Sequence, residues 1–182
     1  VNMNEGNYLT QFNTILCGMS KQMLNQNITI DFIRSMLTIY QAQIDMSNNL
    51  LQNSSYEPLL QIVRNIVGSN TSIIQQMQQI LISSNEYTNC CRDFCCYSDE
   101  YMRIARCMIN RMERSSRCQN INLDFICEII PLCEGIILIC KNLLRYSVNP
   151  TLMSLVENII AEQTEFVKEL VILQASLCNQ DI

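Results

Sequence analysis

The sequence predicts an all-α fold, and within that class an antiparallel four-helix bundle that arose by tandem duplication and carries two extra leading helices. Three observations predict it. The 182-residue chain contains one eight-residue stretch twice, its apolar residues recur at helical spacing, and it has only 4 Gly and 3 Pro. Scarce helix breakers favour long helices over a turn-rich β fold. Because no single helix can bury its own apolar stripe, we expect one domain over residues 1–182.

The repeated stretch covers residues 26–33 and 119–126, and six of its eight positions are identical. The same offset of 93 residues aligns further matching positions before and after this stretch. Such self-similarity is the signature of an internal repeat. The sequence therefore predicts two copies over about 1–85 and 94–178, joined by a Cys-rich junction at 86–97.

Each copy has the pattern of a short helix followed by two long ones. We expect the short leading helices at about residues 5–25 and 98–117. Thr29 and Asn122 occupy equivalent positions just before the apolar stripe of the first long helix. Either side chain can accept a hydrogen bond from a free N–H group of a first helical turn, so we expect these two residues to be N-caps.

Composition excludes several classes of protein. The net charge is -5 and only 16% of residues are charged, so no basic face for nucleic acid is expected. No uncharged apolar run reaches the roughly 18 residues of a membrane span. No basic segment followed by an apolar one marks a signal peptide, so we expect synthesis in the cytoplasm.

The chain has 11 Cys and no His. Without His, the commonest general base and the commonest transition-metal ligand are missing, as are the usual nucleophile–base triads. No Gly-rich phosphate loop is present either. We therefore predict that the protein is not an enzyme and has no catalytic residue and no cofactor. The odd Cys count prevents complete internal pairing into disulfides.

The densest cluster of reactive side chains lies in the junction and comprises Cys90, Cys91, Cys95 and Cys96. On a helix, Cys91 and Cys95 would share a face. Four thiolates could hold a soft metal ion such as Cu(I) or Zn(II). They could equally form disulfides within or between chains, or be inert, and the spacing leaves these three interpretations open.

Cys133 and Cys140 are seven residues apart on a buried stripe. They could be thiolate ligands inside a bundle, but free Cys is often a small buried hydrophobe, which we favour. We therefore predict no metal site, with these two residues and the four junction Cys as the thiolate candidates. Cys127 is expected to face solvent. Three acidic residues of the last helix are expected to form a solvated face: Glu162, Glu165 and Glu169.

Copy two carries Asp124-Phe125-Ile126, then Ile129-Ile130-Pro131, and later Asn149-Pro150, which also reads as an N-cap followed by a first helical residue. Copy one carries Asp31-Phe32-Ile33 and Met36-Leu37. This order resembles the D-F-I, M-I-P and N-P pattern of domain-of-unknown-function family 305, a bacterial family whose members look ferritin-like. The resemblance covers most of the chain and implies a ferritin-like antiparallel four-helix bundle.

The family places a His-His pair directly after its M-I-P motif, and the resemblance would imply metal binding through His and Met. This chain has Ile39-Tyr40 and Leu132-Cys133 at those positions. The family also tends to carry a Glu three residues after a Gln of its last helix, where this chain has Phe166 after Gln163. We therefore expect that the ancestral metal site is lost and that apolar groups fill the centre of the bundle.

A retained helical scaffold with many Cys favours a non-enzymatic structural or interaction protein. We expect protein partners, either as a homo-oligomer or as a disulfide cross-linked assembly, and a spore coat is the analogous setting. The alternative is a thiolate-based protein that binds or stores Cu(I) or another soft metal.

Overall fold

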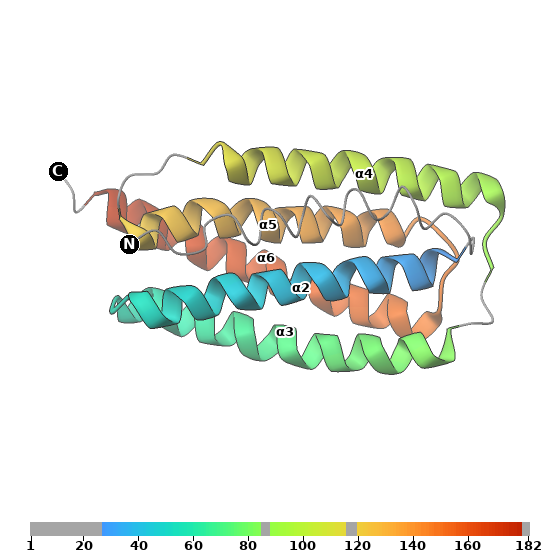
Figure 1. Cartoon of the computed structure of the whole chain (residues 1–182), viewed down its shortest axis with the longest axis horizontal. Helices are drawn as coiled ribbons and strands as arrows, with labels where there is room; N and C mark the ends of the chain where they lie inside the picture. The colour runs from blue at the N-terminus through green and yellow to red at the C-terminus, as the bar shows by residue number, and fades with distance from the viewer. Residues whose placement is uncertain (1–26, 85–87, 116–119, 180–182) are drawn as a thin grey trace.

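The computed structural model describes residues 27–84, 88–115 and 120–179. Within these ranges the chain forms five helices and no strand (Figure 1). The helices are α2 (Ile28–Asn53), α3 (Glu57–Ser83), α4 (Cys91–Glu113), α5 (Ile121–Leu143) and α6 (Pro150–Cys178). The all-α class is confirmed, whereas the leading helix expected at residues 5–25 lies outside the described residues.

Helices α2, α3, α5 and α6 form the larger part of the molecule in Figure 1, where α2 and α6 run in one direction and α3 and α5 in the other. Helix α2 contacts α3 and α5, and α6 contacts the same two helices, so the four close a ring around a common core. We call α2, α3, α5 and α6 the central helices. Helix α4 packs on the outside of α5. The two copies therefore contribute equivalent hairpins, α2–α3 and α5–α6.

Helix α4 begins and ends earlier than the predicted range 98–117. Residues 91–97 are helical, so most of the expected Cys-rich junction belongs to this helix. The Cys90 sulfur accepts a hydrogen bond from the backbone N–H of Asp93 at 3.4 Å, which caps the first turn. The buried stripe also extends into this region, because it starts at Phe94 and continues through Tyr97 and Tyr101.

The predicted N-caps of α2 and α5 are each wrong by two residues. Asn27 caps α2, where its side chain accepts from the N–H of Ile30 at 3.0 Å. Asn120, the equivalent residue of copy two, caps α5 and accepts from the N–H groups of Asn122 and Leu123. Asn is as good an N-cap as Thr, so the choice between neighbouring candidates depends on the rest of the fold.

Thr29 and Asn122 were expected to be N-caps. Each instead accepts a hydrogen bond from a residue of the other copy. The Thr29 hydroxyl accepts from the N–H of Asn149, in the connection before α6, at 3.4 Å. Asn122 accepts from the hydroxyl of Ser54, in the connection before α3, at 2.6 Å. Asn149 caps α6 and Pro150 is its first residue, as the sequence predicts.

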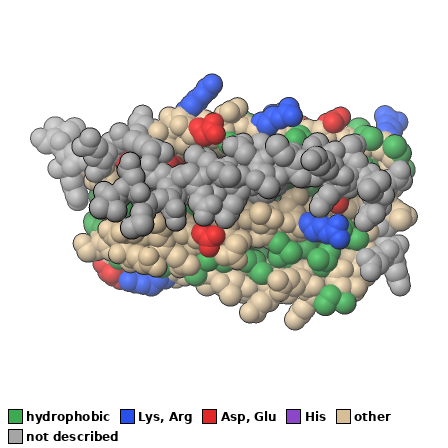
Figure 2. All heavy atoms as spheres, in the orientation of Figure 1, with side chains coloured by type: hydrophobic (Ala, Val, Ile, Leu, Met, Phe, Trp, Pro, Cys, Tyr) green, Lys and Arg blue, Asp and Glu red, His purple; other side chains and the backbone are tan. Residues whose placement is uncertain are grey.

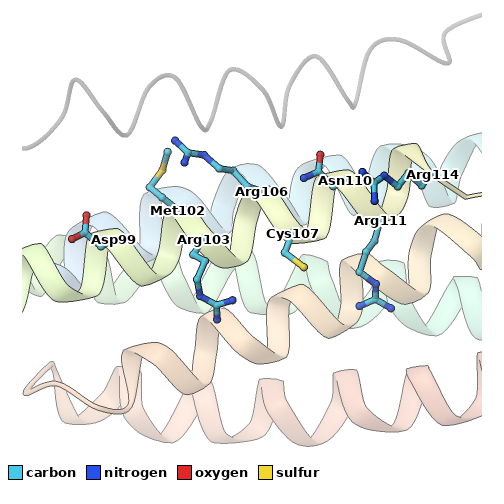
Figure 3. Close-up of a pocket in the computed structure, with 8 residues that line it drawn as sticks. All are labelled: Asp99, Met102, Arg103, Arg106, Cys107, Asn110, Arg111 and Arg114. Atoms are coloured by element: carbon cyan, nitrogen blue, oxygen red, sulfur yellow. The ribbon is translucent and has the colours of Figure 1, made fainter.

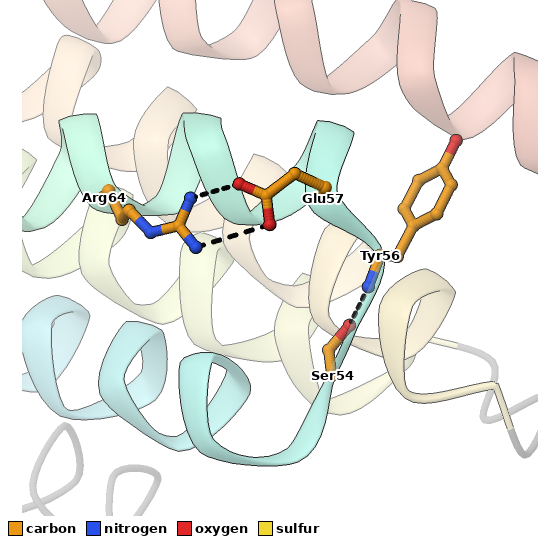
Figure 4. Close-up of polar contacts among 4 residues, drawn as sticks. All are labelled: Ser54, Tyr56, Glu57 and Arg64. Atoms are coloured by element: carbon orange, nitrogen blue, oxygen red, sulfur yellow. Dashed lines mark hydrogen bonds and ion pairs between the residues drawn. The ribbon is translucent and has the colours of Figure 1, made fainter.

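The connection between α2 and α3 is short and is held by local polar contacts (Figure 4). Ser54 accepts a hydrogen bond from the N–H of Tyr56 at 3.1 Å, which turns the chain back on itself. Helix α3 then starts at Glu57, with Pro58 in its first turn, where the missing N–H costs nothing. Arg64 makes a bidentate contact with Glu57 on the exposed face.

The surface is weakly charged. On the face shown in Figure 2, the described Lys, Arg, Asp and Glu side chains are scattered singly or in small groups. Much of this face belongs to backbone and to side chains that are neither charged nor hydrophobic, as the 16% charged content requires. Among the described helices, none has the length and apolar character needed to cross a membrane.

Candidate functional site

The described residues include nine free Cys, and four of them lie at the start of α4. Cys90, Cys91 and Cys96 are exposed, and Cys95 is half-buried. Because α4 packs on the outside of the central helices, this thiol cluster faces away from the core. We call Cys90, Cys91, Cys95 and Cys96 the α4 thiol cluster.

Cys91 and Cys95 lie one helical turn apart, and their thiols interact. A side-chain hydrogen bond with Cys91, with further repulsion from that group, raises the pKa of the Cys95 thiol. Side chains four residues apart on a helix have Cβ atoms about 5–6 Å from each other, whereas a disulfide needs about 3.5–4.5 Å. The pair is therefore too far apart for an unstrained disulfide, and a covalent partner must come from elsewhere.

The other accessible thiols lie far along the helices from this cluster. Cys107 is exposed in the second half of α4, and Cys178 is exposed at the end of α6. Cys127 was expected to face solvent but is half-buried, and its sulfur accepts a hydrogen bond from the Gln174 amide at 3.2 Å. Cys17 and Cys118 lie outside the described residues.

A groove runs along α4, and the described residues that line it belong to that helix and its C-cap (Figure 3). Its lining residues are Asp99, Met102, Arg103, Arg106, Cys107, Asn110, Arg111 and Arg114. Arg103 pairs with Glu100, and Arg111 pairs with Glu134 of α5. Four of the described lining residues are Arg, so the groove gathers positive charge, and Cys107 is the one thiol among them.

Cys133 and Cys140 are both fully buried in α5. Burial raises the pKa of Cys133 to about 12, against a smaller effect of the Gln43 hydrogen bond, and burial also raises the pKa of Cys140. Both thiols therefore keep their protons at physiological pH. Seven helical residues span about 10 Å, so the two sulfurs cannot share one ion.

Across the part of the chain that the structure describes, no three Cys, Asp or Glu side chains are grouped so that they could hold a metal ion. The acidic residues of α6 are exposed, as expected for a solvated face. Glu165 pairs with Lys168 at 3.0 Å, and Glu162 accepts a hydrogen bond from Ser69 of α3 at 2.6 Å.

The expectation that apolar groups fill the centre of the bundle is wrong. Besides Cys133 and Cys140, five polar side chains near the middle of the central helices are fully buried: Tyr40, Gln43, Ser47, Asn70 and Gln163. Gln43 lies at the middle of this polar layer. Its amide donates to the Cys133 sulfur at 3.3 Å and accepts from the Asn70 amide at 2.8 Å.

Three members of the polar layer have side chains with no hydrogen-bond partner among the described residues: Tyr40, Ser47 and Gln163. Both the oxygen and the nitrogen of Gln163 are unpartnered, and the Asn70 amide, although it donates to Gln43, has an unpartnered oxygen. Burial raises the pKa of Tyr40 far above its ordinary value, so the hydroxyl keeps its proton. An unsatisfied buried polar group costs about 1–3 kcal/mol, so this arrangement needs a physical explanation.

The sequence contained a signal for this layer. Asn70 lies between Ile66 and Ile73 on the apolar stripe of α3, and Gln163 occupies the equivalent place on α6. A polar residue at the same stripe position of both copies indicates a buried polar pair. Gln43 gave no such signal, because its counterpart 93 residues later is Ile136.

Comparison of the chain with protein-family models, with curated proteins and with solved structures finds no match. The resemblance to family 305 therefore stays a prediction that rests on the motifs quoted above. The α4 thiol cluster is the candidate functional site, because it is the group of reactive side chains that another molecule can reach.

Proposed function

We propose that this chain is a non-enzymatic structural or interaction protein, which is joined to other protein molecules through the α4 thiol cluster. One observation carries the proposal: four thiols lie within two turns at the outer start of α4, and all four are free. The geometry of the Cys91–Cys95 pair disfavours internal closure. Thiols that are accessible and cannot pair on their own helix are suited to links between molecules.

Each link forms one S–S bond from two thiols and needs an oxidant. With oxidised glutathione, a cluster thiolate attacks the disulfide and releases one reduced glutathione. A thiolate of the second protein molecule then attacks the mixed disulfide and releases the other. Two thiols are oxidised to one disulfide, and one glutathione disulfide is reduced to two thiols. Because the attacking species is the thiolate, this exchange should be faster at pH 8.5 than at pH 7.

The scaffold supports the same proposal. The ring of four antiparallel central helices is the arrangement that a ferritin-like bundle requires, and amides, hydroxyls and neutral thiols now occupy its centre. We propose that the protein keeps a ferritin-like bundle whose ancestral metal site is lost. A cross-linked bacterial layer such as a spore coat is the setting that this proposal favours, by analogy.

Oxidation of the purified protein tests the proposal. The wild type is treated with oxidised glutathione at pH 8.5 and analysed on gels with and without reductant. We expect a ladder of covalent dimers and larger species that reductant removes. A variant with Cys90→Ser, Cys91→Ser, Cys95→Ser and Cys96→Ser should lose most of this ladder.

The matched control carries Cys107→Ser and Cys178→Ser, which removes exposed thiols outside the cluster. It should keep the ladder of the wild type. The proposal is wrong if the quadruple variant cross-links as efficiently as the wild type, or if the wild type stays monomeric at high concentration.

A second candidate function is soft-metal binding, and the Cys91–Cys95 contact favours it. Two neighbouring thiolates suit Cu(I), which prefers soft sulfur ligands. Anaerobic Cu(I) titration against a colorimetric chelator should then give at least one tightly bound ion per chain. The Cys91→Ser, Cys95→Ser variant should lose this ion, and equal binding by that variant would exclude the pair as the site.

A further inference from the structure

The unpartnered Tyr40 hydroxyl and Gln163 amide belong to one group of residues, which the internal repeat identifies. Ser69 and Glu162 are equivalent residues, 93 positions apart, and they contact each other between α3 and α6. Two equivalent residues can touch only where the axis that relates the two copies passes between them. Gln163 follows Glu162 directly, so it lies beside this axis at the centre of the bundle.

In one half of the polar layer, an amide connects three buried residues. Gln43 of α2 donates to Cys133 of α5 at 3.3 Å and accepts from Asn70 of α3 at 2.8 Å. The amide can do both because it carries a donor and an acceptor. The nitrogen of each amide in this half therefore has a protein partner.

The equivalent group in the other half is Tyr40, Ile136 and Gln163, since these residues are the counterparts of Cys133, Gln43 and Asn70. All three are fully buried. Ile136 occupies the place of Gln43 but has no polar atom. It cannot connect its two neighbours, and the side-chain polar atoms of both neighbours lack hydrogen-bond partners among the described residues.

We propose that a buried water molecule binds beside Ile136 and bridges the Tyr40 hydroxyl and the Gln163 side-chain amide. Water can donate to one group and accept from the other, as the Gln43 amide does in the opposite half. Buried waters typically make two to four hydrogen bonds to polar groups that the protein leaves unsatisfied. The groups of the layer are neutral and include both donors and acceptors, which suits water better than an ion.

The direct test is a nuclear Overhauser measurement between water and the side-chain amide protons of Gln163 in the 15N-labelled full chain. The Gln163 signals are assigned by their loss in Gln163→Met. We expect a contact with long-lived water in the wild type. Ile136→Gln restores a bridging amide at the equivalent position, so this contact should disappear. An unchanged contact in Ile136→Gln, or no contact in the wild type, would overturn the proposal.

Thermal unfolding of the same variant has a matched control. Ile129 is also fully buried in α5, but the repeat places no unpartnered amide beside it. Ile136→Gln should unfold within about 3 °C of the wild type, whereas Ile129→Gln should unfold at a much lower temperature. Equal losses for the two variants would count against a polar site at Ile136.

A double-mutant cycle remains informative if Ile136→Gln does not fold. Tyr40→Phe and Gln163→Met each remove one ligand of the proposed water. If they share that water, each single change should lower the melting temperature, and the double change should cost less than the sum. If no water binds, Gln163→Met should raise the melting temperature, because it removes two unsatisfied polar atoms. That result would refute the water site and leave the proposal about the α4 thiols untouched.

Discussion

Among single residues, Asp31 shows how burial can outweigh local electrostatics. It lies in the first turn of α2, where the helix dipole favours a negative charge. Burial nevertheless raises the pKa of this carboxyl from 3.8 to about 6, although Arg34 acts in the opposite direction. The residue is only 9% exposed, so loss of hydration dominates.

This shift gives a pH dependence with a definite sign. The folded chain holds the Asp31 proton more tightly than the unfolded chain, so this group stabilises the fold increasingly as the pH falls from about 7 to about 4. Asp31→Asn should raise the free energy of unfolding at pH 7. It should also make the increase in this free energy between pH 7 and pH 4 smaller than in the wild type. Urea titrations at several pH values measure both effects. The control Asp124→Asn, at the equivalent position, should keep the rise. An Asp31→Asn curve parallel to that of the wild type would contradict this account.

At the scale of helices, two glycines have opposite surroundings. Gly68 lies within α3, and a Cβ built on it would have no other heavy atom within 4 Å. Gly135 lies within α5, and a Cβ there would overlap the side chain of Met108, including the Met108 Cβ at 3.0 Å. The missing side chain at Gly135 therefore allows α4 to approach α5 closely.

The two glycines should respond oppositely to the same substitution. Gly68→Ala should raise the free energy of unfolding by about 0.5–1 kcal/mol, because Ala loses less conformational freedom in a helix. Gly135→Ala should lower it by about 1–3 kcal/mol, as expected for an overpacked core. Adding Met108→Ala should recover part of that second loss. Denaturant titrations of the four proteins measure these changes, and similar shifts for Gly68→Ala and Gly135→Ala would refute the close approach.

The starts of the helices and the contacts between them show which features a sequence can predict. Repeat and periodicity predicted the all-α class and the start of α6 at Asn149–Pro150, because these depend on local patterns. The start of α4 was missed, because a Cys rather than an Asn or Ser accepts the capping hydrogen bond. The role of Gln43 was missed for another reason: its partners come from α3 and α5. The apolar pattern of a helix shows which of its faces is buried. It does not show which polar groups of other helices lie against that face.

For the whole molecule, buried Tyr and Cys side chains make the fold less stable at alkaline pH. Burial raises the pKa of five groups on three helices: Tyr40, Tyr97, Tyr101, Cys133 and Cys140. Their ordinary values are 9.0 for Cys and 10.0 for Tyr. The unfolded chain releases these protons at a lower pH than the folded chain. Their contribution to stability is therefore fully present below about pH 9 and is lost as the pH rises further.

We therefore expect the free energy of unfolding to fall above about pH 9, by up to about 1.4 kcal/mol per pH unit for each group that ionises only in the unfolded chain. Guanidinium titrations at pH 8, 9, 10 and 11, with a phosphine reductant, measure this slope. Cys133→Ala with Cys140→Ala should flatten it between pH 9 and 10, where the two thiols titrate first. Tyr40→Phe should flatten it only above pH 10. Stability that stays constant from pH 8 to 11 would mean that these five groups are hydrated in the folded protein, and hence that the packed core described above is not the one present in solution.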